Sequence, residues 1–324
     1  MKLDRPGPIL CFGEVMLRLS TAPGVRLANA QSLAVHAGGS EANAGALLAQ
    51  LGRQVEMITV LPASPLGDQC EASLRSVGLD TRHVRRSDGR MGLYFVEGTA
   101  GAGRIVYDRA VSAFAENADA SDWPALARDA SWFHMSGINL ALGGKPAEAA
   151  LDAARAMVDA GVPISFDVNH RASLWEDRSE ADVRRVNDLL GLTDVLFTNP
   201  RHIAGLADED AIAGAFAAFP KIAVIAWTER SVEHGRLSAN VTTRDESFET
   251  DAASLANVID RIGSGDAFAG AVIDAILRGA AAEECVKVGL AAAVMKHGIA
   301  GDRWIGTRED LEAFDPFAPE DVRR

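Results

Sequence analysis

Short apolar runs recur along the chain, and helical patterns separate most of them. The first run, Ile9–Phe12, is closed by Gly13 and has the pattern of a buried strand. An apolar run at 55–61 is followed by a helical pattern at 69–77. Further apolar runs follow at 132–137, 162–171, 194–199 and 222–228. This alternation of strands and helices predicts an α/β fold in which helices cover both faces of a mostly parallel sheet.

Two stretches interrupt this alternation and predict antiparallel strands outside the main sheet. In the first, Met16–Ser20 alternates weakly, a turn follows, and Leu33–His36 is a second strand candidate. In the second, 91–97 and 104–109 flank a glycine-rich segment, which predicts a hairpin. A dinucleotide-binding loop is excluded there, because a strand follows the glycines where such a loop requires a helix. Residues 228–250 are polar and are expected to be irregular.

The stretch at 258–279 combines an apolar β-branched run, two glycines and a buried helical pattern. The run begins at Val258, and the helix is expected to open at Gly265 or Asp266. The glycines, Gly263 and Gly265, let the backbone approach a ligand closely. The first N–H groups of a helix lack partners and carry the positive end of its dipole. The pattern therefore predicts a strand, a tight anion-binding loop and a helix.

Asp266 is expected to lie in the positive field of this helix terminus. A carboxylate placed there could take a proton from a hydroxyl that attacks a phosphorus atom. Aspartate is also one of the commonest helix N-cap residues. From the residues alone, both interpretations of Asp266 remain open.

A second glycine-rich helix entrance lies near the start of the chain, at Gly38–Asn43. The residues that follow, Ala44–Leu51, form a strong helical pattern that ends at Gly52, so Asn43 falls on the first turn. A ligand site at this entrance is one interpretation. Ordinary capping of the helix by Ser40 is the other.

Polar side chains end the predicted strand at 162–171. Asp167, Asn169 and Arg171 alternate there, so they are expected to project to one side of the strand. The carboxyl edge of an open α/β sheet is where ligands bind in such folds. These three residues are therefore candidates for a ligand site.

The chain's only two tyrosines, Tyr94 and Tyr107, lie in the predicted hairpin together with Arg109. Such a cluster of two phenols and a guanidinium could bind a ligand. Strand propensity for the tyrosines and a solvated arginine would equally account for it.

Composition limits the classes of partner. The 324 residues carry a net charge of −13, which argues against nucleic acid or an anionic membrane as the main partner. An anionic small substrate would need a local basic pocket. Three widely spaced cysteines indicate neither a disulfide framework nor a zinc site, and no apolar run approaches the length of a membrane span. A reducing cytoplasm is the expected location.

Several separated stretches together resemble one family, the ribokinase-like or PfkB carbohydrate kinases. The two glycine-rich entrances, Gly38–Asn43 and Asp260–Gly270, look like the two signatures of that family. Other stretches resemble its 2-keto-3-deoxygluconate kinases, namely Gly92–Glu97, Tyr107–Ala110, Ser136–Ile138, Ser165–Arg171 and Leu174–Trp175. Motifs that agree jointly and in order are far more specific than any one of them.

This resemblance implies one ribokinase-like domain over residues 1–324, with a β-lid formed by about 14–37 and 90–113. It implies ATP- and Mg²⁺-dependent transfer of a phosphoryl group to a primary hydroxyl, and it is compatible with a homo-oligomer formed through the β-lid. Asp266 would be the base, and the amides of Gly263, Ser264 and Gly265 would form the anion hole. The implied substrate-binding residues are Gly39, Asn43, Tyr94, Tyr107, Arg109, Ile138, Arg171 and Asp302. The implied nucleotide-binding residues are Gly263, Gly265, Asn199 and Thr228.

The resemblance also implies that Arg109 and Arg171 bind the carboxylate of a sugar acid, since arginine pairs bidentately with carboxylates.

Two departures from the family pattern concern the nucleotide side. His202 stands where family members commonly have a glutamate that organises magnesium, and Trp227–Ser231 replaces a glycine-rich turn. Two alternatives stay beside a 2-keto-3-deoxygluconate kinase, and the second of them is suggested by His202. One is a kinase for a neutral ketose such as fructose, and the other is a catalytically silent sugar-acid-binding regulator.

Overall fold

A ten-stranded sheet runs through the part of the chain that the computed structural model describes, which is residues 3, 5–98, 104–119, 121–170, 179–199, 211–255 and 258–318. Neighbouring strands from one edge are β5 (Val84–Ser87), β4 (Val55–Pro62), β1 (Ile9–Phe12), β8 (Trp132–Ser136), β9 (Ile164–Asp167), β10 (Val195–Phe197), β11 (Val224–Ser231), β12 (Arg236–Thr243) and β13 (Ser247–Glu249). The strands from β5 to β11 are parallel, and β12 pairs antiparallel with β11, β13 and β14 (Ala253–Ser254). The predicted mostly parallel sheet is confirmed.

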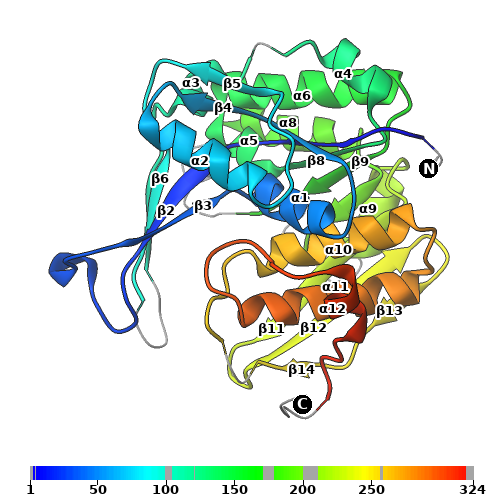
Figure 1. Ribbon diagram of the computed structural model, residues 1–324. Coiled ribbons are helices and arrows are strands. Elements are labelled where there is room, and N and C mark those ends of the chain that lie inside the picture. Colours follow the sequence, from blue (N-terminus) through cyan, green and yellow to red (C-terminus); the bar gives the residue numbers. More distant parts are fainter. Residues whose placement is uncertain are drawn as a thin grey trace.

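Helices cover both faces of this sheet, as predicted (Figure 1). Ile9 and Cys11 of β1 pack into one apolar core, and the alternate residues Leu10 and Phe12 pack into the other. The first core is covered by α1 (Ser40–Gln50), α2 (Pro65–Arg75), α10 (Ser264–Leu277) and α11 (Ala282–His297). The second is covered by α3 (Ala113–Asn117), α4 (Trp123–Asp129), α5 (Gly137–Leu142), α6 (Gly144–Asp159), α8 (Glu180–Leu190) and α9 (Ala211–Ala218).

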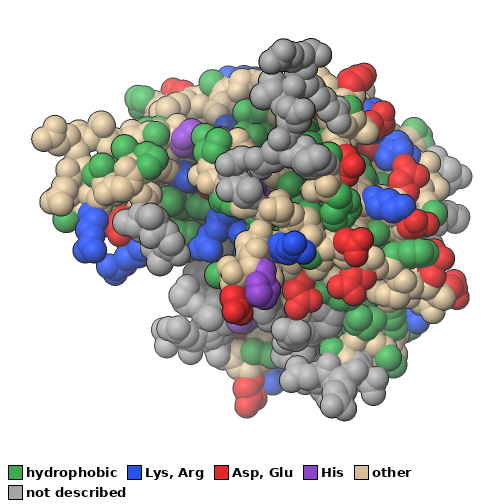
Figure 2. Space-filling view, turned by 90° about the horizontal axis from the view of Figure 1, so that it is seen from below, with side chains coloured by type: hydrophobic (Ala, Val, Ile, Leu, Met, Phe, Trp, Pro, Cys, Tyr) green, Lys and Arg blue, Asp and Glu red, His purple; other side chains and the backbone are tan. Residues whose placement is uncertain are grey.

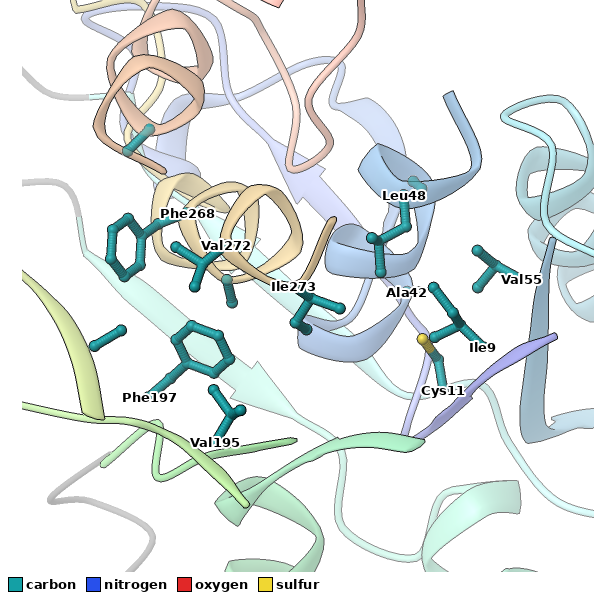
Figure 3. Packing of buried hydrophobic residues seen from close by; sticks show 14 of the residues in the cluster. Ile9, Cys11, Ala42, Leu48, Val55, Val195, Phe197, Phe268, Val272 and Ile273 are labelled. Carbon is teal, nitrogen blue, oxygen red and sulfur yellow. The ribbon is translucent and has the colours of Figure 1, made fainter. Parts of the chain in front are cut away.

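The buried face of α10 fixes the position of its first turn over the sheet. Phe268, Val272 and Ile273 point from α10 toward the strands, and Phe197 of β10 meets them (Figure 3). The rings of Phe197 and Phe268 lie edge to face with centroids 6.2 Å apart. Since α1 packs directly beside α10, the two glycine-rich helix entrances are brought together. A short last helix, α12 (Arg308–Ala313), packs against α11.

A separate four-stranded sheet forms from the two interrupting stretches and projects from one side of the main sheet (Figure 1). Its order is β3 (Ala34–Gly38), β2 (Met16–Ser20), β6 (Leu93–Val96) and β7 (Ile105–Asp108), and η1 (Leu27–Asn29) lies between β2 and β3. The hairpin of β6 and β7 is antiparallel, as predicted, whereas β2 and β6 are parallel. We call these four strands the small sheet.

The strand predicted to begin at Val258 is absent. Val258 and Ile259 are 45% and 67% exposed, and the backbone N–H groups of Ile259 and Asp260 donate to the His297 carbonyl oxygen. The β-branched residues therefore lie in a surface loop that is held by the end of α11, and not in the sheet. The helix that follows begins at Ser264, slightly earlier than expected.

The prediction that 228–250 is irregular is also wrong. Much of this stretch lies in β11, β12 and β13, which are joined by antiparallel pairing. Leu237, Ala239 and Val241 alternate into the core, while polar residues occupy the positions between them. Because polar residues dominate the composition of this stretch, the period-two pattern of its apolar residues was not recognised as that of a strand.

Acidic and basic side chains are interspersed on the face shown in Figure 2, and acidic ones gather on the right of that view. Such a surface agrees with the net charge of −13. Within the described residues, every helix is too short or too polar to cross a membrane.

Candidate active site

A pocket of about 350 Å³ lies where the small sheet meets the first turns of α1 and α10. It brings together residues that are far apart in the sequence. Thirteen of the predicted site residues line it, namely Gly39, Asn43, Tyr94, Tyr107, Arg109, Ile138, Asp167, Asn169, Gly263, Ser264, Gly265, Asp266 and Asp302. The small sheet therefore forms one wall of the pocket, and the two glycine-rich helix entrances form another.

The two glycines of the 263–265 loop are needed for different reasons. Gly263 is the N-cap of α10 and has a φ of 84°, and a side chain there would collide with the backbone carbonyl of Asp302. Gly265 has no neighbouring atom within 4 Å of where a side chain would begin, so its backbone faces open space. The first glycine shapes the turn, and the second leaves the helix terminus accessible to an anion.

The backbone amides of this loop are not equivalent. The Ser264 N–H donates to the Arg261 carbonyl oxygen at 3.3 Å. Within the described residues, the N–H groups of Gly263 and Gly265 make no hydrogen bond. These two amides are therefore the ones available to an anion in this structure, and the geometry favours them over Ser264.

Two side chains of α1 hold the carboxylate of Asp266. The Ser40 hydroxyl donates to Oδ1 at 2.8 Å, and the Asn43 amide donates to Oδ2 at 2.7 Å. Ser40 also accepts a hydrogen bond from Asn169 Nδ2 at 2.9 Å. Asp266 is the third residue of α10 and Gly263 is its N-cap, so the N-cap interpretation of Asp266 is wrong.

The capping interpretation of Ser40 is wrong as well. Gly39 is the N-cap of α1, and no side-chain hydrogen bond caps the helix. The hydroxyl of Ser40 points instead to the Asp266 carboxylate. Asn43 uses its amide nitrogen on that carboxylate, and its Oδ1 is buried without a hydrogen-bond partner in the described residues.

Arg109 is buried in the pocket wall and pairs with Glu14. Its Nε donates to Glu14 Oε2 at 2.8 Å, its Nη2 donates to the same oxygen, and Ser112 donates to Oε1 at 2.6 Å. The guanidinium lies 5.9 Å from the centre of the Tyr107 ring, which stacks on Tyr94. A solvated arginine is therefore excluded, and Glu14 is a site residue that sequence reasoning missed.

Asp302 is tied to the small sheet by Arg18 of β2. Arg18 Nη1 lies 2.7 Å from Asp302 Oδ1 and 2.6 Å from Asp260 Oδ2, and the Tyr94 hydroxyl donates to Asp302 Oδ2. Burial raises the pKa of Asp302 although Arg18 opposes this effect. A basic residue in the alternating strand Met16–Ser20 was the available signal for Arg18.

Glu41 lies beneath the pocket on the first turn of α1. Its Oε1 accepts hydrogen bonds from the Ser136 backbone N–H at 2.8 Å, the Ser136 hydroxyl at 2.7 Å and Asn139 Nδ2 at 3.0 Å. Burial nevertheless raises the pKa of Glu41 to about 7, because these hydrogen bonds only partly offset the loss of water.

We expect Glu41→Gln to change how stability depends on pH. A carboxyl whose folded pKa lies above its unfolded value binds more protons when folded, so its contribution to stability is lost as pH rises from about 4.5 to about 7. The variant should therefore be more stable than the wild type at pH 8, by up to ~3 kcal/mol, and closer to it at pH 5. Urea unfolding at both pH values measures the difference. A difference that does not vary with pH would contradict the raised pKa.

A second pocket, of about 290 Å³, is also lined by Gly265. Asn199, which follows β10, and Thr228 of β11 line it, so both predicted nucleotide-side residues lie here. Asp167, Asn169 and Gly265 line both pockets. The two pockets therefore meet at the first turn of α10, beside Asp266.

Asp167 and Asn169 do not project as alternate residues of one strand, because β9 ends at Asp167 and Asn169 has a φ of 42°. Both nevertheless reach the pockets. Arg171 and His202 lie outside the described residues. The first pocket is also lined by residues that were not predicted as site residues, namely Glu14, Met16, Ser40, Glu41, Ile105, Arg230, Arg261 and Ile262.

Comparison with known proteins identifies the family. Residues 8–302 match the model of the pfkB family of carbohydrate kinases. The chain belongs to this family. It is therefore a sugar kinase, a phosphotransferase that uses an alcohol group as acceptor, and the predicted ribokinase-like fold is confirmed.

Three similar proteins match this chain over nearly its whole length. A 2-dehydro-3-deoxygalactonokinase from Haloferax volcanii is 30% identical, over 94% of this chain and 95% of the relative. A 2-dehydro-3-deoxygluconokinase from Bacillus subtilis is 28% identical, over 97% and 96%. The crystal structure of a 2-dehydro-3-deoxygluconokinase from Thermotoga maritima superposes with a TM-score of 0.85, at 32% identity over 94% of this chain and 98% of that one.

Proposed function

We propose that this sugar kinase transfers the γ-phosphoryl group of ATP to the primary hydroxyl of 2-keto-3-deoxy-D-gluconate, forming 2-keto-3-deoxy-6-phosphogluconate. The observation that carries this proposal is the placement of Asp266 at the point where two pockets meet, next to the accessible backbone of Gly265. The names of the relatives support the sugar-acid class.

Asp266 acts as the base in this proposal. Ser40 and Asn43 orient its two carboxylate oxygens, so the acceptor hydroxyl can approach from the first pocket. The attacking oxygen gives its proton to Asp266 as its bond to phosphorus forms and the bond to the leaving ADP oxygen breaks. The amides of Gly263 and Gly265 stabilise the charge on the transferred group.

The sugar lies against the small sheet. Tyr94, Tyr107 and Ile138 enclose it, while Gly39 and Asp302 meet its hydroxyls. Arg109 and Arg171 bind the carboxylate. Arg109 can contribute although it is paired, because Glu14 occupies its Nε and Nη2 and leaves Nη1 for the substrate.

The nucleotide occupies the second pocket, with Asn199 and Thr228 on its wall. Within the described residues, no group of three or more His, Cys, Asp or Glu side chains could hold a metal ion. Magnesium in phosphoryl-transfer sites is commonly held by one or two carboxylates and the phosphates themselves, where it neutralises charge. Asp167 and Asn199 line the pocket and fit this arrangement as oxygen donors.

A neutral ketose such as fructose is the second candidate substrate. One observation favours it: the charge of Arg109 is already neutralised by Glu14, so this pair adds little net attraction for a carboxylate. A third candidate, a silent sugar-acid-binding regulator, is disfavoured by the intact arrangement around Asp266.

A substrate panel tests the proposed function. ATP-dependent ADP formation is measured with 2-keto-3-deoxygluconate, its C4 epimer 2-keto-3-deoxygalactonate, and fructose. We expect kcat/KM for at least one sugar acid to exceed that for fructose by about tenfold or more, the size of one charge-assisted hydrogen bond. Preference for fructose would select the second candidate. Binding of a sugar acid in calorimetry without any turnover would select the third.

A further inference from the structure

Lys296, near the end of α11, is a completely buried lysine, with 0% of its surface exposed. Its ammonium donates to two backbone carbonyl oxygens, that of Ile299 at 2.9 Å and that of Asp260 at 3.3 Å. Within the described residues, no carboxylate oxygen lies within 4.0 Å of it. A buried charge without an ion-pair partner is costly, so the surroundings must compensate for it.

The two carbonyls belong to two loops next to the 263–265 loop, which is called the anion-binding turn because its amides are proposed above to bind an anion. Asp260 lies three residues before Gly263, and Ile299 lies three residues before Asp302. The turn at Gly263 packs directly on the Asp302 backbone. Any movement of one loop relative to the other would therefore displace the turn.

Asp260 connects the same loops a second time. Its Oδ1 accepts from the Ile262 N–H and its Oδ2 from the Gly301 N–H, each at 3.1 Å, and Oδ2 also pairs with Arg18. The Lys296 ammonium approaches Asp260 from its backbone side. Lys296 of α11 and Arg18 of the small sheet therefore both contact Asp260, the first at its backbone carbonyl and the second at its carboxylate.

We propose that the Lys296 ammonium is a built-in cation that positions the anion-binding turn by holding the 259–263 and 299–302 loops together. Lys296 is a positioning residue, because it reaches the reaction through Gly263 and Gly265. The inference rests on the anion-binding role proposed above for these two glycines.

Charges of both signs act on the Lys296 ammonium, and two of them are carboxylates that favour its charged form. Burial lowers the pKa of Lys296 to about 8. The positive charge of Arg18 adds to this effect, and the negative charges of Asp260 and Asp266 oppose it. The side chain is thus mostly charged at pH 7. Its field adds to that of the α10 terminus, in the direction that favours a phosphate group.

The first test removes the charge but keeps the length of the side chain. Lys296→Met should fold, since it keeps the length of the side chain and removes an unpaired charge whose burial is costly. We expect kcat to fall by about 10- to 100-fold, the effect of displacing a catalytic group slightly. KM for the sugar should change less than about threefold. Lys287→Met is the matched control, because Lys287 is an exposed lysine of the same helix.

The second test restores the charge. Lys296→Ala leaves room for a small cation, so we expect ammonium ions to recover about tenfold or more of its kcat. Tetramethylammonium, which is too large and cannot donate a hydrogen bond, should not. Neither salt should rescue Lys296→Met, whose side chain fills the space.

Two results would overturn the role of Lys296. One is a folded Lys296→Met variant with kcat within threefold of the wild type. The other is a Lys296→Ala variant that ammonium stabilises against heat without restoring kcat, since that is the behaviour of a purely structural lysine. If Lys296→Met does not fold, the ammonium titration of Lys296→Ala decides. All rates are measured with the best acceptor of the wild type, so failure of the proposed substrate appears in the wild type and failure of this inference only in the variants.

Discussion

Asp266→Asn is expected to lower kcat by ~10² or more while nucleotide and sugar binding change only a few-fold, the signature of losing a positioned base. The structure explains why binding should survive. The new amide can still accept from Asn43 through its oxygen, and its NH₂ can donate to Ser40, because a hydroxyl can also accept. Steady-state kinetics with calorimetry of each substrate separates the two effects.

Ser40→Ala is the companion variant for this prediction. It removes one hydrogen bond to the Asp266 carboxylate but leaves the base in place, so we expect a loss of about tenfold or less. If the Asn variant turns over at a near-normal rate, Asp266 has a structural role and the proposed chemistry is wrong. If both variants lose activity equally, orientation of the carboxylate is the decisive factor.

Features that depend on neighbouring residues were predictable from the sequence. The left-handed Gly263, the open Gly265 and the helix that follows are all encoded within a few residues, because backbone conformation and helix initiation are local. The antiparallel hairpin of β6 and β7 was predictable for the same reason. The α/β alternation predicted the main sheet, since it repeats along the chain.

Partners that are far apart in the sequence were not predictable. Arg109 could be identified as a candidate ligand residue, but its pairing with Glu14 joins positions 95 residues apart. Arg18 and Asp302 are separated by 284 residues. Without knowledge of the packing, an arginine with a carboxylate partner looks the same as a free one.

Exposure of individual apolar residues was the other source of error. Val258 and Ile259 have high strand propensity, but backbone hydrogen bonds to the end of α11 hold their segment as a loop. Lys296 shows the reverse case. A lysine in the last turn of a helix is commonly a solvated residue that complements the dipole, and only the fold reveals that its ammonium is enclosed by two loops.

The burial of Arg109 changes how its role must be tested. If it binds the substrate carboxylate, Arg109→Ala should cost about 1.5 to 3 kcal/mol, or roughly 10- to 150-fold in kcat/KM for the sugar acid. The single variant also leaves the Glu14 carboxylate buried and unpaired in the pocket wall, which repels the substrate and can destabilise the small sheet. A second variant must therefore remove both charges.

In the double variant Glu14→Gln/Arg109→Ala, we expect part of the loss on the sugar acid to be recovered, because the repulsion is gone, while kcat/KM stays well below that of the wild type. Activity on fructose should change less than about threefold in the double variant, and thermal melting reports on the small sheet in both. Equal losses on sugar acid and fructose would indicate a folding defect of the small sheet. Full recovery in the double variant would show that Arg109 serves only to neutralise Glu14, and the carboxylate would then have to be bound by other groups.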